Sequence, residues 1–272
     1  MTWVESAVVT NDARRAFRLL HKAGTFVLPN PWDVPSARLL EHLGFPALAT
    51  TSSGFAASLG RPDQHVTRDE LVTHVATLTA AVRLPVTVDA ERGYADDPAG
   101  VAQTVQMLAE AGASGVSIED YDPATGRIDP VGVAVERIAA AASVCTRYGM
   151  VLTGRAENHL YRSADLPDTI ARLTAYRDAG AGCLYAPGLR DLGDIATVVR
   201  EVGTAVNVLA LRDGPTVSQL AAVGVRRVST GGSLAWAAYG ALVHAATELR
   251  DNGTSTYLDQ ALPRPLREAA FS

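Results

Sequence analysis

Strand-like and helix-like segments alternate eight times along the 272 residues of this chain, and this alternation limits the folds open to it. Short β-branched apolar runs predict strands, and longer segments with apolar residues three and four apart predict helices. Strands that alternate with helices favour a parallel sheet. The predicted strands span residues 25–28, 46–50, 86–91, 116–121, 150–157, 182–186, 205–211 and 227–230. The predicted helices span residues 11–23, 34–43, 68–82, 98–111, 131–148, 168–179, 192–202, 217–222 and 234–249.

The even spacing of these units indicates an α/β fold of the closed (β/α)8 TIM-barrel type. A doubly wound sheet is the alternative, but that fold usually carries a glycine-rich phosphate loop after its first strand. Here the first predicted strand is followed by Pro29, Asn30, Pro31 and Trp32. Because no linker-like break interrupts the pattern, we expect residues 1–272 to form one barrel domain with an N-terminal helix and a C-terminal tail.

Charge and hydrophobicity exclude several classes of partner. The formal net charge of −5 and the isoelectric point near 5.7 argue against binding to nucleic acid or to an anionic membrane. No apolar run is long enough to cross a bilayer, and the N-terminal residues do not resemble a signal peptide, so we expect a cytoplasmic protein.

Cys145 and Cys183 are too few for a zinc motif or a disulfide framework, and their apolar surroundings predict buried thiols.

Two successive predicted strands end in carboxylates, where a barrel places its chemistry. Asp89 and Glu91 end the third strand, and Glu119 ends the fourth. Side chains two apart on a strand point to the same side, so Asp89 and Glu91 are expected to face one place. Such acids could share a Mg²⁺ ion, which prefers oxygen ligands. The alternative is that they only cap the helices that follow.

Polar residues near other strand ends have two interpretations each. The residues after the second strand could bind an anionic oxygen or form an ordinary turn. Asp63 is either a solvated loop acid or a pocket residue. Arg155 could hold a substrate carboxylate through two hydrogen bonds, or pair with one of the acids. Asn207 needs a partner, which is either the substrate or a neighbouring backbone group. The residues after the second strand are Ser52, Ser53 and Gly54.

Together these motifs resemble the isocitrate lyase/phosphoenolpyruvate mutase superfamily, in the order that the superfamily has them, over roughly residues 25–250. The matching segments are residues 35–40, 51–63, 88–94, 115–120 and 154–155. The resemblance implies a modified barrel whose last helix is exchanged between the subunits of a homodimer or homotetramer. It also implies Mg²⁺ or Mn²⁺ held by Asp89 and Glu119, with Glu91 in contact through water.

The resemblance also implies roles for the remaining site residues. Asp63 would lie beside the reacting bond, and Arg155 would bind a substrate anion. Asn207 would contact the substrate. A carboxylate or oxyanion would be bound by Ser52, Ser53 and Gly54.

At several positions that bear on the choice of substrate, the chain lacks residues found in particular members of the superfamily. The loop of residues 121–130 has neither the cysteine nor the histidine of isocitrate-type lyases. Ser117 and Pro187 replace a histidine and a glutamate of methylisocitrate lyases, and the gating loop of the phosphonate-forming mutases is absent. We therefore expect residues 122–130 to form a lid without a catalytic thiol.

These observations favour a Mg²⁺-dependent carbon–carbon lyase acting on a small 2-oxo or 2-hydroxy acid. A phosphonomutase or phosphonopyruvate-type hydrolase is one alternative, and a barrel that binds a 2-oxo acid without catalysis is the other.

Overall fold

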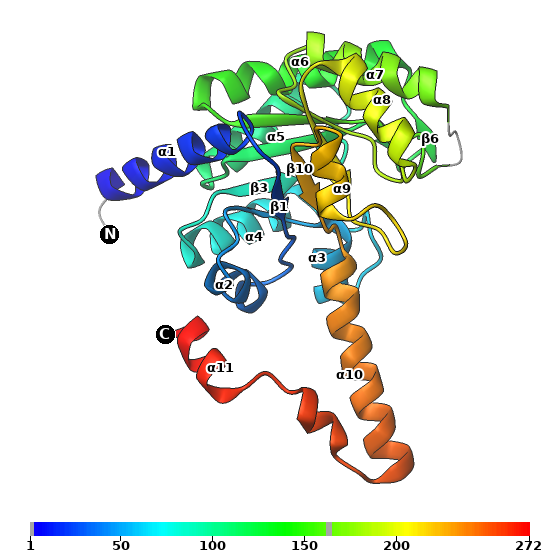
Figure 1. The fold of residues 1–272 in the computed structure, drawn as a ribbon. Helices are drawn as coiled ribbons and strands as arrows, with labels where there is room; N and C mark the ends of the chain where they lie inside the picture. Colours follow the sequence, from blue (N-terminus) through cyan, green and yellow to red (C-terminus); the bar gives the residue numbers. More distant parts are fainter. Residues whose placement is uncertain (1–2, 162–164) are drawn as a thin grey trace.

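Eight parallel strands form the expected barrel (Figure 1). The structure, a computed structural model, describes residues 3–161 and 165–272, with residues 3–9 described by their backbone alone. The strands neighbour one another in the order β1-β10-β9-β8-β7-β4-β3-β2. The Ala49 N–H donates to the Pro29 carbonyl oxygen at 3.0 Å, which brings β2 back to β1 and nearly closes the sheet. The strands are β1 (Phe26–Leu28), β2 (Leu48–Ala49), β3 (Val86–Asp89), β4 (Gly115–Glu119), β7 (Val151–Arg155), β8 (Cys183–Tyr185), β9 (Ala205–Leu209) and β10 (Arg227–Ser229).

Helices follow the strands, and most begin at a residue that caps the first turn. The side chains of Asp33, Thr67, Asp97, Asp165 and Asp191 each accept a hydrogen bond from a backbone N–H three residues on, which satisfies one of the free donors of a helix start. Six helices follow the strands β1, β2, β3, β7, β8 and β9, in this order: α2 (Val34–His42), α4 (Arg68–Ala81), α5 (Pro98–Glu110), α7 (Leu166–Asp178), α8 (Leu192–Val202) and α9 (Val217–Ala222). A seventh helix, α6 (Val131–Tyr148), follows the hairpin after β4.

Along each strand, one side chain faces the helices and the next faces the barrel interior. The outward residues form the main hydrophobic core beneath the helices and include Val88, Val116, Ile118, Leu152, Leu184, Val206 and Val228. At mid-height the interior is polar, with Thr87, Ser117, Thr153, Asn207 and Arg227. TIM barrels usually fill this space with bulky branched side chains. The small polar residues here leave room for a cavity instead.

Helix α1 (Trp3–Leu20) seals the N-terminal end of the barrel. The Phe17 ring is fully buried and packs edge-on against Phe26, with the ring centroids 6.4 Å apart. Gly115 permits this approach, because a Cβ atom at that position would come within 2.8 Å of the Phe17 ring. A small cluster of apolar residues completes the seal: Leu28, Ala47, Ala49, Val151 and Cys183.

Several local elements of the structure differ from the sequence prediction. Helix α1 begins at Trp3 rather than at residue 11. The segment after β2, for which an ordinary turn was one interpretation, is a short helix, α3 (Ser52–Ser58), capped by Thr51. The predicted lid is a β-hairpin built from β5 (Tyr121–Asp122) and β6 (Arg127–Ile128), with Gly126 at a φ of +66° in its turn.

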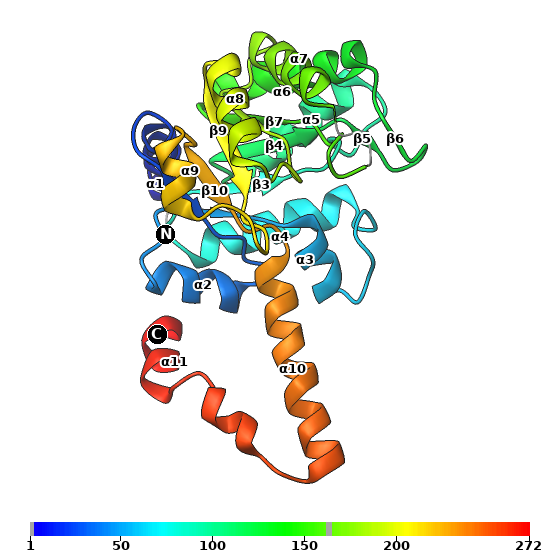
Figure 2. The same ribbon diagram turned by 45° about the vertical axis from the view of Figure 1, so that its right-hand side comes forward.

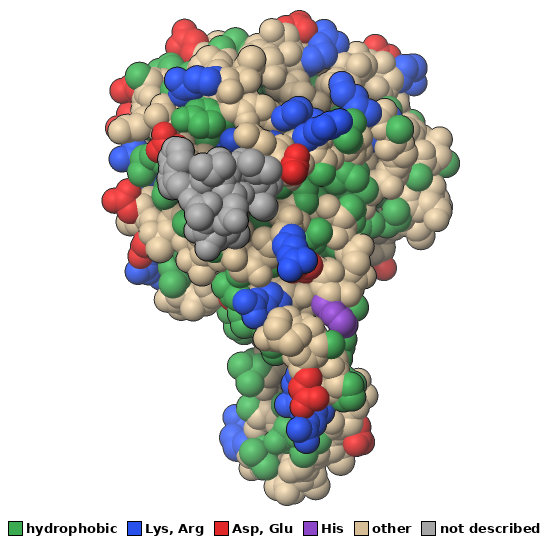
Figure 3. Space-filling model, turned by 90° about the vertical axis from the view of Figure 1, so that its left-hand side faces the viewer, with side chains coloured by type: hydrophobic (Ala, Val, Ile, Leu, Met, Phe, Trp, Pro, Cys, Tyr) green, Lys and Arg blue, Asp and Glu red, His purple; other side chains and the backbone are tan. Residues whose placement is uncertain are grey.

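The last long helix, α10 (Ser233–Asn252), leaves the barrel as a projecting arm (Figures 1 and 2). Only Ala235 of this helix is buried, and its first residues contact α3. The predicted tail is partly ordered: η1 (Thr256–Gln260) leads to α11 (Arg264–Phe271), which packs on α2. Hydrophobic side chains are visible on the projecting arm (Figure 3). Among the described residues, no helix is long and apolar enough to cross a membrane.

Candidate active site

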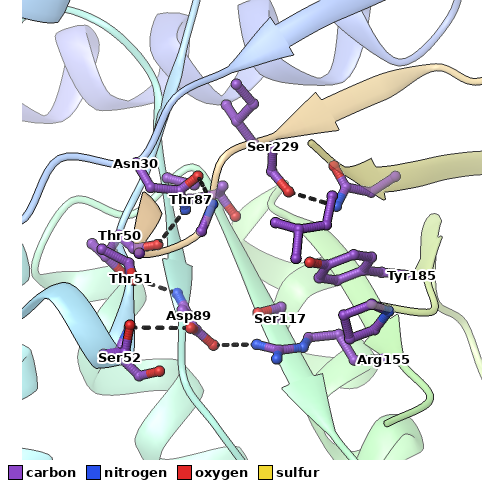
Figure 4. Close-up of a pocket in the computed structure, with 18 of the residues that line it drawn as sticks. Asn30, Thr50, Thr51, Ser52, Thr87, Asp89, Ser117, Arg155, Tyr185 and Ser229 are labelled. Atoms are coloured by element: carbon purple, nitrogen blue, oxygen red, sulfur yellow. Dashed lines mark hydrogen bonds and ion pairs between the residues drawn. The ribbon is translucent and has the colours of Figure 1, made fainter. Parts of the chain in front are cut away.

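A cavity of about 200 Å³ opens at the C-terminal ends of the strands. It extends from Asp63 near the mouth to Arg227 and Leu28 inside the barrel. Figure 4 shows Asp89 between Ser52 and Arg155, with Ser117 and Tyr185 close by. The barrel has therefore brought most of the predicted site residues together.

Arg155 lies at the centre of three carboxylates. Its Nη1 is 2.6 Å from Asp89 Oδ1, its Nη2 is 3.0 Å from Glu119 Oε2, and its Nε is 2.8 Å from Glu157 Oε1. The strand register explains the contact with Glu119, because this residue is paired with Arg155 across β4 and β7. Of the two interpretations of Arg155, the ion pair is therefore the arrangement found. Sequence reasoning assigned no role to Glu157, although its side chain is almost completely buried here.

Glu91 reaches the same acidic cluster, but not for the reason that the sequence indicated. Strand β3 ends at Asp89, and Glu91 lies in the following turn with a left-handed φ of +46°. The prediction that both residues belong to one strand and point to the same side of it is therefore wrong. A left-handed φ in a non-glycine residue stores strain, which is typical of functional sites. Burial, followed by the charge on Asp89, raises the pKa of Glu91 to about 8, and its Oε1 atom has no hydrogen-bond partner.

Asp63 lies at the mouth of the cavity, in the loop between α3 and α4. It is largely exposed, but the Ser52 hydroxyl donates a hydrogen bond to it. Partial burial and the charge on Asp89 raise the pKa of the Asp63 carboxyl. The pocket interpretation of Asp63 is thus the one that the geometry favours.

The start of α3 places two of its three predicted binding residues in the cavity. Ser52 and Ser53 line it, and the Ser52 N–H donates to Asp89 Oδ2 at 3.2 Å. Gly54 is buried outside the lining, and its N–H donates to the Thr51 hydroxyl at 3.3 Å. The Gly54 amide is thereby occupied by the helix cap and is not directed to the cavity.

The inner end of the cavity is a network of uncharged hydrogen-bonding groups around one arginine. Asn207 Nδ2 donates to Ser229 Oγ at 2.9 Å, and Arg227 Nε donates to Asn207 Oδ1 at 2.9 Å. Asn207 thus has both of its side-chain groups satisfied by neighbouring side chains. Sequence reasoning missed Arg227 and Ser229. Their spacing of two on β10 was the available signal, because it places both on the interior face.

The donor chemistry of the cluster suits a divalent cation. Among the described residues, no three Asp, Glu, His or Cys side chains are grouped around a common point as metal ligands. Mg²⁺ does not require such a group, because it usually binds one or two carboxylates and keeps several waters. The unpartnered Glu91 Oε1 atom and the surplus of carboxylates over Arg155 favour a bound cation. Asp89, Glu91 and Glu119 therefore fit the implied Mg²⁺ in charge and ligand type.

The hairpin of the predicted lid is anchored at its C-terminal end. Arg92 Nε and Nη2 lie 2.7 and 2.9 Å from the two carboxylate oxygens of Asp129, and Arg137 lies 3.8 Å from the same residue. Tyr121 at the start of the hairpin stacks on Tyr161, with the ring centroids 3.6 Å apart. His159 hydrogen-bonds with Thr169 at 3.0 Å and does not line the cavity.

Both cysteines are buried, as predicted, and we expect thiol reagents to leave the activity of the protein intact. Cys145 is 3% exposed in the outer core, and Cys183 is fully buried at the sealed end of the barrel. Burial raises the pKa of Cys145 to about 12 and also raises that of Cys183, so little reactive thiolate forms at pH 7. Activity should be followed during incubation with N-ethylmaleimide. Rapid inactivation that substrate and Mg²⁺ prevent would contradict this expectation.

Comparison with known proteins places the chain among lyases and mutases. Residues 17–250 match the family model of phosphoenolpyruvate phosphomutase. An uncharacterized protein of Mycobacterium tuberculosis is 38% identical over 242 residues, which cover 87% of this chain and 89% of the relative. An oxaloacetate decarboxylase of Rhodopseudomonas palustris is 33% identical over 196 residues, which cover 69% of this chain and 67% of that enzyme.

The fold comparison agrees. The crystal structure of a candidate lyase/mutase from Burkholderia cenocepacia has a TM-score of 0.93 and 49% identity, and the match covers 97% of both chains. The sequence motifs, the barrel fold and the matched family model all indicate the same superfamily. The chain belongs to the phosphoenolpyruvate phosphomutase family, within the isocitrate lyase/phosphoenolpyruvate mutase superfamily that its motifs resemble.

Proposed function

We propose that this protein is a carbon–carbon lyase that cleaves a small 2-oxo or 2-hydroxy carboxylic acid through an enolate. The observation that carries the proposal is a cluster of acids at the mouth of the cavity, with Arg155 as their only ion-pair partner among the described residues. Asp63 and Asp89 line the cavity, Glu119 is buried against Arg155, and the charges on Asp89 and Asp63 act on the buried Glu91. Such a site favours Mg²⁺ or Mn²⁺, held by Asp89 and Glu119 with Glu91 in support. A bound divalent cation would stabilise the negative charge of the enolate.

The residues around the cluster have separate tasks in this proposal. Arg155 uses three of its five N–H donors on carboxylates and directs the remaining two to the substrate carboxylate. Ser52 and Ser53 bind a substrate oxygen. When the carbon–carbon bond breaks, its electron pair stays on the enolate carbon. The other carbon leaves as carbon dioxide, or as a carbonyl compound when a hydroxyl group on it gives its proton to Asp63. Asp63, whose pKa is raised, then returns a proton to the enolate carbon.

We also propose that α10 is exchanged between the subunits of a homodimer or homotetramer. In this chain α10 leaves the barrel and exposes Trp236, Leu242, Val243 and Leu249, each more than half exposed. Exposed apolar side chains at this density mark an interaction surface. The occupant proposed here is the barrel of a second copy. Light scattering should give a mass of at least twice 28.6 kDa.

The test of the function is turnover of four acids with Mg²⁺, with Mn²⁺ and with EDTA. Oxaloacetate, 2-methylisocitrate, dimethylmalate and phosphonopyruvate separate the alternatives. Metal-dependent cleavage of one of the first three supports the lyase proposal. Turnover of phosphonopyruvate alone would favour the phosphonomutase or hydrolase alternative, which the family name also supports. Binding of metal and acid without any turnover would favour a non-catalytic barrel.

Replacing Asp89 with alanine is expected to abolish most Mg²⁺ binding. Asp89 ends β3 beside Glu119 and faces the cavity. Loss of a supporting residue around a metal typically costs about 10–100-fold in affinity, so loss of a direct ligand should cost at least that much. Isothermal titration calorimetry of the purified variant measures this affinity. Asp96→Ala in the exposed part of the following loop is the matched control, and Mg²⁺ affinity equal in both variants would remove the metal assignment.

A further inference from the structure

An arginine lines the inner end of the cavity, whereas the acidic cluster lies at its mouth. Arg227 is 4% exposed, and it lines the same cavity as Asp89. Its Nε donates to Asn207 Oδ1 at 2.9 Å, and its Nη2 donates to Thr153 Oγ1 at 3.0 Å. Both partners are uncharged, so these hydrogen bonds do not neutralise the guanidinium.

No negative group of the described residues compensates this charge. None of their ion pairs includes Arg227. The titratable groups that face it are His21, whose Nε2 is 3.4 Å from Nη1, and Cys183. Burial and then Arg227 itself lower the pKa of His21 to about 3, and burial raises the pKa of Cys183, so both are neutral near pH 7. A buried charge without a counter-charge is costly, and the cavity is where a counter-ion can lie.

We propose that Arg227 binds a second carboxylate at the far end of the substrate, and that it thereby selects dicarboxylic over monocarboxylic acids. Ser229 and Asn207 flank it along the cavity wall. Three of the five guanidinium N–H groups face acceptors already described, and the other two remain for a carboxylate. This inference rests on the proposed function, because it places the 2-oxo or 2-hydroxy end of the substrate at Asp89.

The distribution of charge along the cavity supports a ligand with two polar ends. Carboxylates dominate the mouth, where Asp63 and Asp89 lie, whereas Arg227 is a cation at the inner end. A monocarboxylic acid with an alkyl end would place a methyl group against a buried guanidinium. That arrangement leaves the cation unpaired, whereas a terminal carboxylate forms charge-assisted hydrogen bonds with it.

The wild-type protein provides the first test. Malate and 2-hydroxybutyrate have the same chain length and differ by a carboxylate in place of a methyl group. Isothermal titration calorimetry in the presence of Mg²⁺ should show malate binding about 30-fold more tightly, as expected for a hydrogen bond between charged groups. Equal affinities of the wild-type protein for the two acids would overturn the proposal, independently of the results with Arg227 variants.

Variants of Arg227 separate recognition from a structural role. Arg227→Met should weaken malate binding by about 30-fold and leave 2-hydroxybutyrate binding nearly unchanged. Arg227→Lys keeps the charge and should retain part of the preference. General damage to the fold would weaken both ligands alike. The neighbouring Arg226, which does not line the cavity, supplies the control Arg226→Met. A folded Arg227→Met protein with the wild-type preference would overturn the proposal.

The outcomes for this inference and for the proposed function are distinct. If the protein prefers malate through Arg227 but turns over none of the four acids, the recognition site is supported and the lyase assignment is wrong. If the protein cleaves a 2-oxo acid but binds malate and 2-hydroxybutyrate equally, the lyase assignment is supported and the proposed role of Arg227 is wrong.

Discussion

Arg155→Met is expected to destabilise the fold by about 3–5 kcal/mol, because it leaves buried carboxylates without their counter-charge. Arg155 is the last residue of β7, and its side chain is only 13% exposed. It touches Glu119 and Glu157, which are 3% and 1% exposed. Urea denaturation at pH 7.5 measures the free energy of unfolding.

Two further variants make the result specific. Arg155→Lys keeps one positive charge and should lose less stability, although a lysine cannot reproduce the guanidinium fork. Arg200→Met removes an exposed arginine that pairs with Glu201 on the surface, and it should change stability by less than about 1 kcal/mol. If Arg155→Met costs no more than Arg200→Met, the ion-pair cluster does not stabilise the barrel.

The metal-free protein is expected to lose about 3–5 kcal/mol of stability through Glu91 as the pH rises from 4.5 to 8. The pKa of Glu91 is about 8 in the folded state and near its ordinary value of 4.5 when unfolded. Between these values the folded state binds a proton that the unfolded state has released. Stability must then fall as the pH rises, and it becomes independent of this group above pH 8. Urea titrations in EDTA across this range measure the slope.

Glu91→Gln should flatten this pH dependence. Glutamine cannot ionise, so the variant should exceed the wild type in stability at pH 8.5 and match it near pH 4.5. Asp63 and Glu119 also have raised pKa values and leave a residual slope of the same sign. Glu136→Gln on the exposed face of α6 is the control. Parallel curves for wild type and Glu91→Gln would contradict the assignment of the buried charge to Glu91.

The barrel could be predicted from the sequence because its signal is repetitive and local. Apolar strand residues such as Val88 and Ile118 pack beneath helices, and their alternation with polar residues is visible in the sequence. The acids at the ends of β3 and β4 followed from the rule that barrel chemistry lies at strand ends. Asp89 lines the cavity, whereas Glu119 is buried against Arg155 beside it.

The remaining details depend on backbone geometry and on long-range charge. The left-handed turn at Glu91 has no sequence signal, since glycine is the residue expected there. The cap at Thr51 withdraws the Gly54 amide from the cavity, and a Ser-Ser-Gly segment fits a turn equally well. Arg227 was missed because an arginine inside a barrel contradicts the usual burial of apolar residues. Arg155 was described as having two possible partners because contacts across strands become known only with the register.

The seal formed by α1 has a kinetic consequence. Phe17 and its neighbours close one end of the barrel, and the cavity opens at the other end, beside Asp63 and Asp89. Whatever binds beside Arg227 has to pass the acidic cluster on its way in and again on its way out. In the proposed cleavage, the two fragments would therefore depart in a fixed order, with the fragment nearer the mouth first. The deeper fragment is the last to leave, and it competes directly with the next substrate molecule for the empty enzyme.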